Sequence, residues 1–133
     1  MIRDINNVIR VPVKLDTSFF KYWLEFIRPF HQLAPREIDV MASLLNNRFE
    51  LSKVIKDSVI LEKVALNEDA KDRAMKECNM SNNYLQVILG RFRKKKIIGN
   101  EGINPRFVPN IDLDNPTGVF KLLLLFEVKD GKD

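Results

Sequence analysis

Residues 80–100 read MSNNYLQVILGRFRKKKIIGN, and this stretch predicts a short helix that ends in a basic run and a tight turn. Ser81 is a good N-cap, because its hydroxyl can accept a hydrogen bond from a free backbone N–H of the first helical turn. Gly99 is predicted to end the helix. The apolar residues follow the i, i+3, i+4, i+7 spacing of a core-facing helix side, at Leu85, Ile88, Leu89 and Phe92.

The basic run is the most informative feature of this stretch. Residues 91–96 hold five lysines and arginines in six positions and no acidic residue. One or two cations are enough to stabilise the negative end of a helix dipole, by about 0.3–1 kcal/mol each. Five cations also repel one another, so the run favours a polyanionic partner such as nucleic acid. A solvated helix end that happens to be basic is the alternative.

The helix period predicts which residues would meet such a partner. A turn of about 100° per residue gives an outward face made of Asn83, Gln86, Val87, Gly90 and Lys94. Asn and Gln can pair bidentately with adenine, so the predicted base contacts are Asn82, Asn83 and Gln86. The predicted phosphate contacts are Arg91, Arg93, Lys94, Lys95 and Arg106. Ser-Asn-Asn is also common in caps and turns, which leaves a purely local role open for both asparagines.

The rest of the chain predicts helices and short strands. Residues 8–14 alternate and are rich in β-branched side chains, and Pro12 confines them to an edge strand. Residues 16–30 have helical apolar spacing, which Pro29 ends or kinks. Further helices are predicted at 33–47, within 49–67 and at 68–79, then a small hairpin at 95–110 and an apolar strand at 118–130. The strands 8–14 and 119–128 either pair with each other or join a second subunit.

Two segments resemble a known family. Residues 33–45, LAPREIDVMASLL, are similar to the opening helix of winged helix-turn-helix domains. Residues 69–98, DAKDRAMKECNMSNNYLQVILGRFRKKKII, resemble the second helix, turn and recognition helix of that family. The resemblance implies an α+β fold: a winged helix-turn-helix core with an extra N-terminal strand and helix and a C-terminal strand. The chain departs from the family pattern at Lys96, where a glycine is usual, and at Glu101 in the wing tip.

A length of 133 residues and the overall composition fit one compact domain. The net charge of +4 permits a polyanionic partner. Its expected parts are an N-terminal strand and amphipathic helix at 1–32, the winged helix-turn-helix at 33–110 and a C-terminal apolar strand and tail at 111–133. The single Cys78 and the single His31 form no metal-ligand or nucleophile pattern, so neither an enzyme nor a cofactor is predicted. The longest apolar run, 122–126, is too short to span a membrane.

These features predict a DNA-binding protein. The expected partner is double-stranded DNA, contacted by the recognition helix at 81–96, and the expected role is transcriptional regulation in the cytoplasm of a bacterial cell. A homodimer is compatible with this role, because helix-turn-helix proteins commonly read paired half-sites. The alternative is a phage structural or assembly protein, in the virion or in packaging, that uses a winged-helix scaffold for contacts with other phage proteins.

Overall fold

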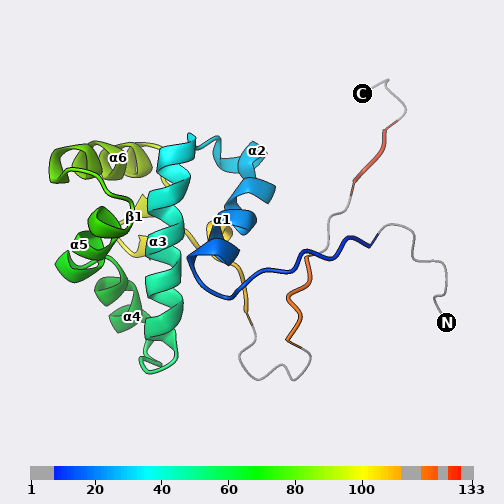
Figure 1. Ribbon diagram of the computed structural model, residues 1–133, viewed down its shortest axis with the longest axis horizontal. Coiled ribbons are helices and arrows are strands. Elements are labelled where there is room, and N and C mark those ends of the chain that lie inside the picture. The colour runs from blue at the N-terminus through cyan, green and yellow to red at the C-terminus, as the bar shows by residue number, and fades with distance from the viewer. Residues whose placement is uncertain (1–7, 112–117, 123–125, 130–133) are drawn as a thin grey trace.

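The computed structural model describes residues 8–111, 118–122 and 126–129 (Figure 1). Within them the chain is mostly helical with one small antiparallel sheet, which is compatible with the expected α+β class. The helices are α1 Thr17–Phe26, α2 Arg28–His31, α3 Pro35–Ser52, α4 Ser58–Ala65, α5 Glu68–Glu77 and α6 Asn82–Lys94. The strands are β1 Ile98–Gly99 and β2 Gly102–Ile103, followed by the 3-10 helix η1 Pro105–Phe107.

Helix α3 runs through the centre of the fold, with α1 and α2 on one side and α4, α5 and α6 on the other (Figure 1). Pro35 occupies the first turn of α3, where the missing N–H costs no hydrogen bond. Buried apolar side chains surround most of the helix, at Ile38, Val40, Met41, Ala42, Leu44 and Leu45. Such all-round burial is expected of a helix that is covered from both sides.

Helices α5 and α6 are joined by four residues, 78–81. Asn79 in this turn has a φ of 51°, in the left-handed region that asparagine tolerates better than most residues. Ser81 caps α6 as predicted, and its Oγ accepts a hydrogen bond from the Tyr84 N–H at 3.2 Å. The predicted core face of α6 is also confirmed, with buried side chains at Leu85, Ile88, Leu89 and Phe92.

The prediction that Gly99 ends α6 is wrong. The helix ends at Lys94, and Lys96 adopts the left-handed conformation with a φ of 61°. The Ile97 N–H then donates to the Phe92 carbonyl at 2.8 Å and closes the last turn. A lysine therefore occupies the position that glycine fills with least strain, while Gly99 lies in β1.

The predicted small hairpin is confirmed. Ile98 pairs with Ile103 in the antiparallel register of β1 and β2. Gly102 has a φ of 114°, and a Cβ at this position would lie 2.8 Å from the Cβ of Glu62 in α4. Both the backbone conformation and the close approach of α4 therefore require glycine here.

The two predicted terminal strands are not present in the described part of the chain. Residues 8–14, 118–122 and 126–129 belong to no sheet, and residues 123–125 and 130 of the predicted C-terminal strand lie outside the described ranges. No backbone hydrogen bond joins residues 8–15 to 118–122 or 126–129. A strand needs a neighbour for its N–H and C=O groups, and the two-residue strands of the hairpin are too short to supply one.

His31 connects the N-terminal helices to α3. Its Nε2 donates to the Leu24 carbonyl at 2.7 Å, and its Nδ1 accepts from the Leu33 N–H at 2.9 Å. These two bonds require a neutral ring with the proton on Nε2. Burial lowers the pKa of His31 below its ordinary value, because the charged ring would lose its water.

Candidate nucleic-acid interface

Helix α6 presents an exposed polar face opposite its buried one. Asn82, Asn83 and Gln86, the predicted base contacts, are all exposed. Gly90 lies on the same outward face, and a Cβ at this position would have no atom within 4 Å. The outward face is therefore open along the helix, which has 13 residues and a length of about 20 Å.

The five predicted phosphate contacts are exposed but differ in their surroundings. The side chains of Arg93 and Lys94 have no hydrogen-bond or ion-pair partner among residues 8–111, 118–122 and 126–129. Lys95, by contrast, donates from its Nζ to the Gln32 carbonyl at 3.2 Å. Among the predicted phosphate contacts, the side chains that are free to bind an external anion are therefore those of Arg93 and Lys94.

Arg91 binds a buried carboxylate. Its Nη1 lies 3.2 Å from Oε2 of Glu37, whose side chain is only 5% exposed while that of Arg91 is 52% exposed. The other oxygen of Glu37 accepts a hydrogen bond from the Ala34 N–H at 2.9 Å, at the start of α3. Arg91 thus fixes α6 against the first turn of α3, a role that the sequence pattern did not reveal.

Arg106 lies away from the predicted base contacts. Its guanidinium stands over the Phe30 ring, 5.9 Å from the centroid, and Lys95 binds the carbonyl of Gln32 two residues further along the chain. Both cations therefore contact residues 30–32, beside the C-terminal end of α6. Asn82 and Asn83 are at the opposite end of that helix, so base and phosphate contacts would be spread along its length.

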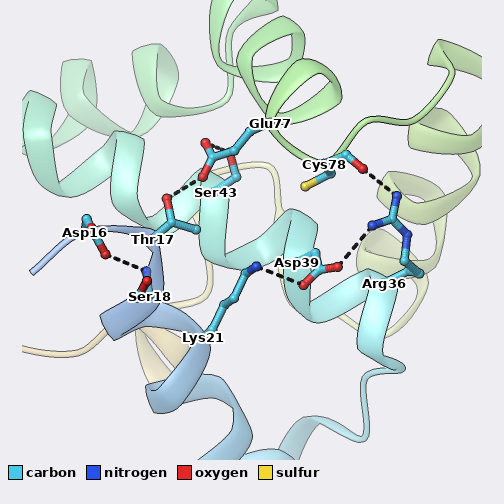
Figure 2. Close-up of polar contacts among 9 residues, drawn as sticks. All are labelled: Asp16, Thr17, Ser18, Lys21, Arg36, Asp39, Ser43, Glu77 and Cys78. Atoms are coloured by element: carbon cyan, nitrogen blue, oxygen red, sulfur yellow. Dashed lines mark hydrogen bonds and ion pairs between the residues drawn. The ribbon is translucent and has the colours of Figure 1, made fainter. Parts of the chain in front are cut away.

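A polar network positions the turn that precedes α6 (Figure 2). Arg36 of α3 donates to the Cys78 carbonyl at 2.6 Å and forms an ion pair with Asp39 at 3.1 Å. Glu77, the last residue of α5, accepts a hydrogen bond from Ser43 of α3 at 3.0 Å. The network joins α3 to the end of α5 and so holds the start of α6 in place. Its contacts between α3 and the end of α5 join residues 42 and 34 positions apart, so no local sequence pattern indicates them.

The lone cysteine belongs to this structural region. Cys78 is buried, and burial raises the pKa of its thiol above the ordinary value. A thiol in that state is a poor nucleophile. Among the residues that the structure describes, no group of three His, Cys, Asp or Glu side chains could hold a metal ion. In the same ranges no helix is long and apolar enough to cross a membrane.

Comparison with protein-family models, with curated proteins and with solved structures gives no match for this chain. The geometry of α6 and its surroundings is therefore the basis for a functional conclusion. That geometry consists of an open polar face, two free cations, and a capped helix held from behind by α3 and the network of Figure 2.

Proposed function

We propose that this protein binds double-stranded DNA through α6, with a winged helix-turn-helix fold, and acts as a transcriptional regulator in the bacterial cytoplasm. The observation that carries the proposal is the outward face of α6. Exposed amides that can read adenine lie at one end of it, and the free cations Arg93 and Lys94 lie at the other.

The connection between α5 and α6 supports this proposal. A helix-turn-helix unit joins its two helices by a turn of three or four residues, often with a glycine. Here the turn has four residues, 78–81, and Asn79 adopts the left-handed conformation that glycine would otherwise supply. In such units the second helix enters the major groove and its N-terminal residues contact base edges. Asn82, Asn83 and Gln86 occupy the first turns of α6.

Gly90 supports the same conclusion. Glycine in a helix interior costs about 1 kcal/mol relative to alanine. No neighbouring atom in the part of the chain that the structure describes requires a glycine at position 90, since a Cβ there would meet open space. A close approach of α6 to a DNA backbone would explain why position 90 carries no side chain.

Acidic side chains limit where DNA can lie. Glu68 and Asp69 are exposed in the first turn of α5, and Glu101 is exposed at the tip of the hairpin. Each would repel a phosphate at close range. The proposed contact is therefore concentrated on α6 and does not use the hairpin as a positively charged wing.

The direct test is binding of a fluorescent random-sequence duplex across a series of salt concentrations. The logarithm of affinity should fall with the logarithm of salt by about 0.9 for each phosphate contact. The double variant Arg93→Ala/Lys94→Ala should bind more weakly, with a slope shallower by about 1.8. Asn83→Ala and Gln86→Ala should instead reduce discrimination between sequences once a preferred site has been selected.

The control is Lys56→Ala/Lys63→Ala, which removes the same charge from the α3–α4 connection and from α4, far from α6 in Figure 1. It should leave the slope unchanged. Equal loss of slope in both double variants would show that general positive charge attracts the DNA, and no binding at low salt by the folded wild type would refute the proposal.

A phage structural or assembly protein is a second candidate, favoured by one specific observation. Large apolar side chains are exposed on several elements, among them Val54, Val59 and Ile60 around the start of α4. Exposed apolar patches commonly mark contacts with other proteins. Absence of DNA binding at low salt, together with recovery of the chain in a larger protein assembly, would favour this second function.

A further inference from the structure

The N-terminal arm, residues 8–15, is amphipathic and exposed. Its side chains alternate, so that Ile9, Val11, Val13 and Leu15 share one face of an extended chain. All of its residues are exposed, and Ile9 is exposed to 88%. The arm makes no backbone hydrogen bond with the described residues beyond its own turn at Lys14.

Pro12 leaves the arm only one complete edge. In an extended chain the N–H and C=O groups of odd- and even-numbered residues point to opposite edges. Pro12 has no N–H, so the even edge is interrupted, while the edge of residues 9, 11, 13 and 15 is intact. The intact edge belongs to the same residues that carry the apolar face.

The arm is complementary to a second copy of itself. In an antiparallel pair centred on Val11, Ile9 lies opposite Val13 and Val11 lies opposite its own equivalent. These become the hydrogen-bonded pairs, and Pro12 falls at a non-hydrogen-bonded position where it is tolerated. The apolar side chains of both arms then lie on one face, as a two-fold axis requires.

An aromatic strip on α1 and α2 offers cover for that face. Tyr22, Phe26 and Phe30 are spaced four residues apart and are 56%, 55% and 59% exposed. Tyr22 and Phe26 are helical neighbours of Phe19 and Trp23, which pack on the ring of Phe120 with centroids 5.2 and 5.9 Å apart. The segment around Phe120 therefore lies next to the strip.

The exposed area of the aromatic strip is too small to form a stable dimer interface by itself. Three aromatic side chains a little over half exposed present roughly 300 Å². A stable interface buries about 800 Å² on each partner, so the strip needs the arms to complete it. A two-stranded ribbon is likewise unstable by itself and needs an apolar surface to pack against.

We infer that this protein forms a two-fold dimer in which the N-terminal arms of two copies pair antiparallel about Val11 and pack on the aromatic strips. In Figure 1 the arm leaves the fold on the side away from α5 and α6. The paired arms therefore lie on the side of the fold away from α6, while the strip ends at Phe30, whose ring lies under the Arg106 guanidinium. The dimer forms without DNA and does not rest on the proposed DNA binding.

Sedimentation velocity of the full chain without DNA tests the inference. The wild type should sediment as a dimer of twice 15.5 kDa. Val11→Pro removes the two central N–H donors of the ribbon and should weaken dimerisation about 30-fold. Arg10→Pro is the matched control, because the N–H of Arg10 lies on the edge that Pro12 already interrupts, and its dimer should be unchanged. Phe26→Asp should also give monomers, because it places a charge in the interface.

A cross-link tests the register. Val11→Cys places two thiols directly opposite each other, within the Cα separation that a disulfide spans, so mild oxidation should yield a covalent dimer. The wild type, whose Cys78 is buried, should stay uncross-linked. The inference is overturned by a monomeric wild type, by equal effects of the two proline variants, or by no cross-link at Val11→Cys. Circular dichroism confirms that each variant keeps its helices.

Discussion

Gly90 allows a prediction in which stability and function change in opposite directions. The residue lies in the interior of α6, and a Cβ added to it would meet no atom within 4 Å. Gly90→Ala should therefore gain the full difference in helix propensity, about 1 kcal/mol. For a domain of this size that gain corresponds to a rise in Tm of roughly 3–6 °C. If α6 lies against DNA, the added methyl group should at the same time weaken binding, and the bulkier Gly90→Gln should weaken it further.

Two measurements on the same samples separate these effects. Thermal unfolding followed by circular dichroism gives the change in Tm, and anisotropy with a labelled duplex gives the change in affinity. A fall in Tm for Gly90→Ala would refute the stability reasoning, since it would mean that the helix surface is not open at this position. A rise in Tm with unchanged DNA affinity, for both Gly90→Ala and Gly90→Gln, would refute the placement of this face on DNA.

Three further predictions concern the contacts that hold α6 and α2. Lys96→Gly should stabilise the protein by about 1 kcal/mol in urea unfolding, because Lys96 is held in the left-handed conformation. Burial holds the pKa of His31 below its unfolded value near 6.5. The contribution of His31 to stability is therefore complete above pH 6.5 and is lost as the pH falls through the folded-state pKa. Urea midpoints at a series of pH values measure this loss. Arg91→Ala should lower the free energy of unfolding by about 1–2 kcal/mol in the same assay, because it leaves the Glu37 carboxylate buried without its cation. The loss is smaller than for a fully buried pair, because Arg91 is half exposed.

Each of these has a control that could contradict it. Lys96→Ala keeps the strained conformation and should give none of the gain of Lys96→Gly. His31→Gln should remove the loss of stability between neutral pH and the onset of carboxylate titration, since His31 is the only histidine in the sequence. Glu37→Gln should recover part of the stability lost in Arg91→Ala, and full additivity of the two changes would show that the pair does not interact.

Helix α6 could be predicted from sequence because its determinants are local. The Ser81 cap acts three residues away, and the buried face follows a period that a single helix imposes. The end of the helix was predicted wrongly for a physical reason. Position 96 lies in the left-handed region that favours glycine but carries lysine, and the Ile97 N–H closes the turn around it by donating to the Phe92 carbonyl.

Contacts between distant residues could not be predicted. Glu37 and Arg91 are 54 positions apart, and nothing in the local pattern of either shows that one carboxylate is buried by the fold and paired with the other helix. The N-terminal strand was predicted wrongly for a related reason. Alternation in residues 8–14 shows that a segment can form a strand, but only a partner with free N–H and C=O groups makes it one.

Pro12 also bears on aggregation. A segment that is rich in β-branched residues, has an apolar face and can form hydrogen bonds along both edges can add further copies without limit and grow into a cross-β fibril. An arm that can bond along one edge alone terminates after its first partner, since the outer edge of the resulting ribbon lacks a donor in the middle of each strand. Pro12 thus allows the apolar N-terminal arm to be exposed while preventing its growth into a polymer.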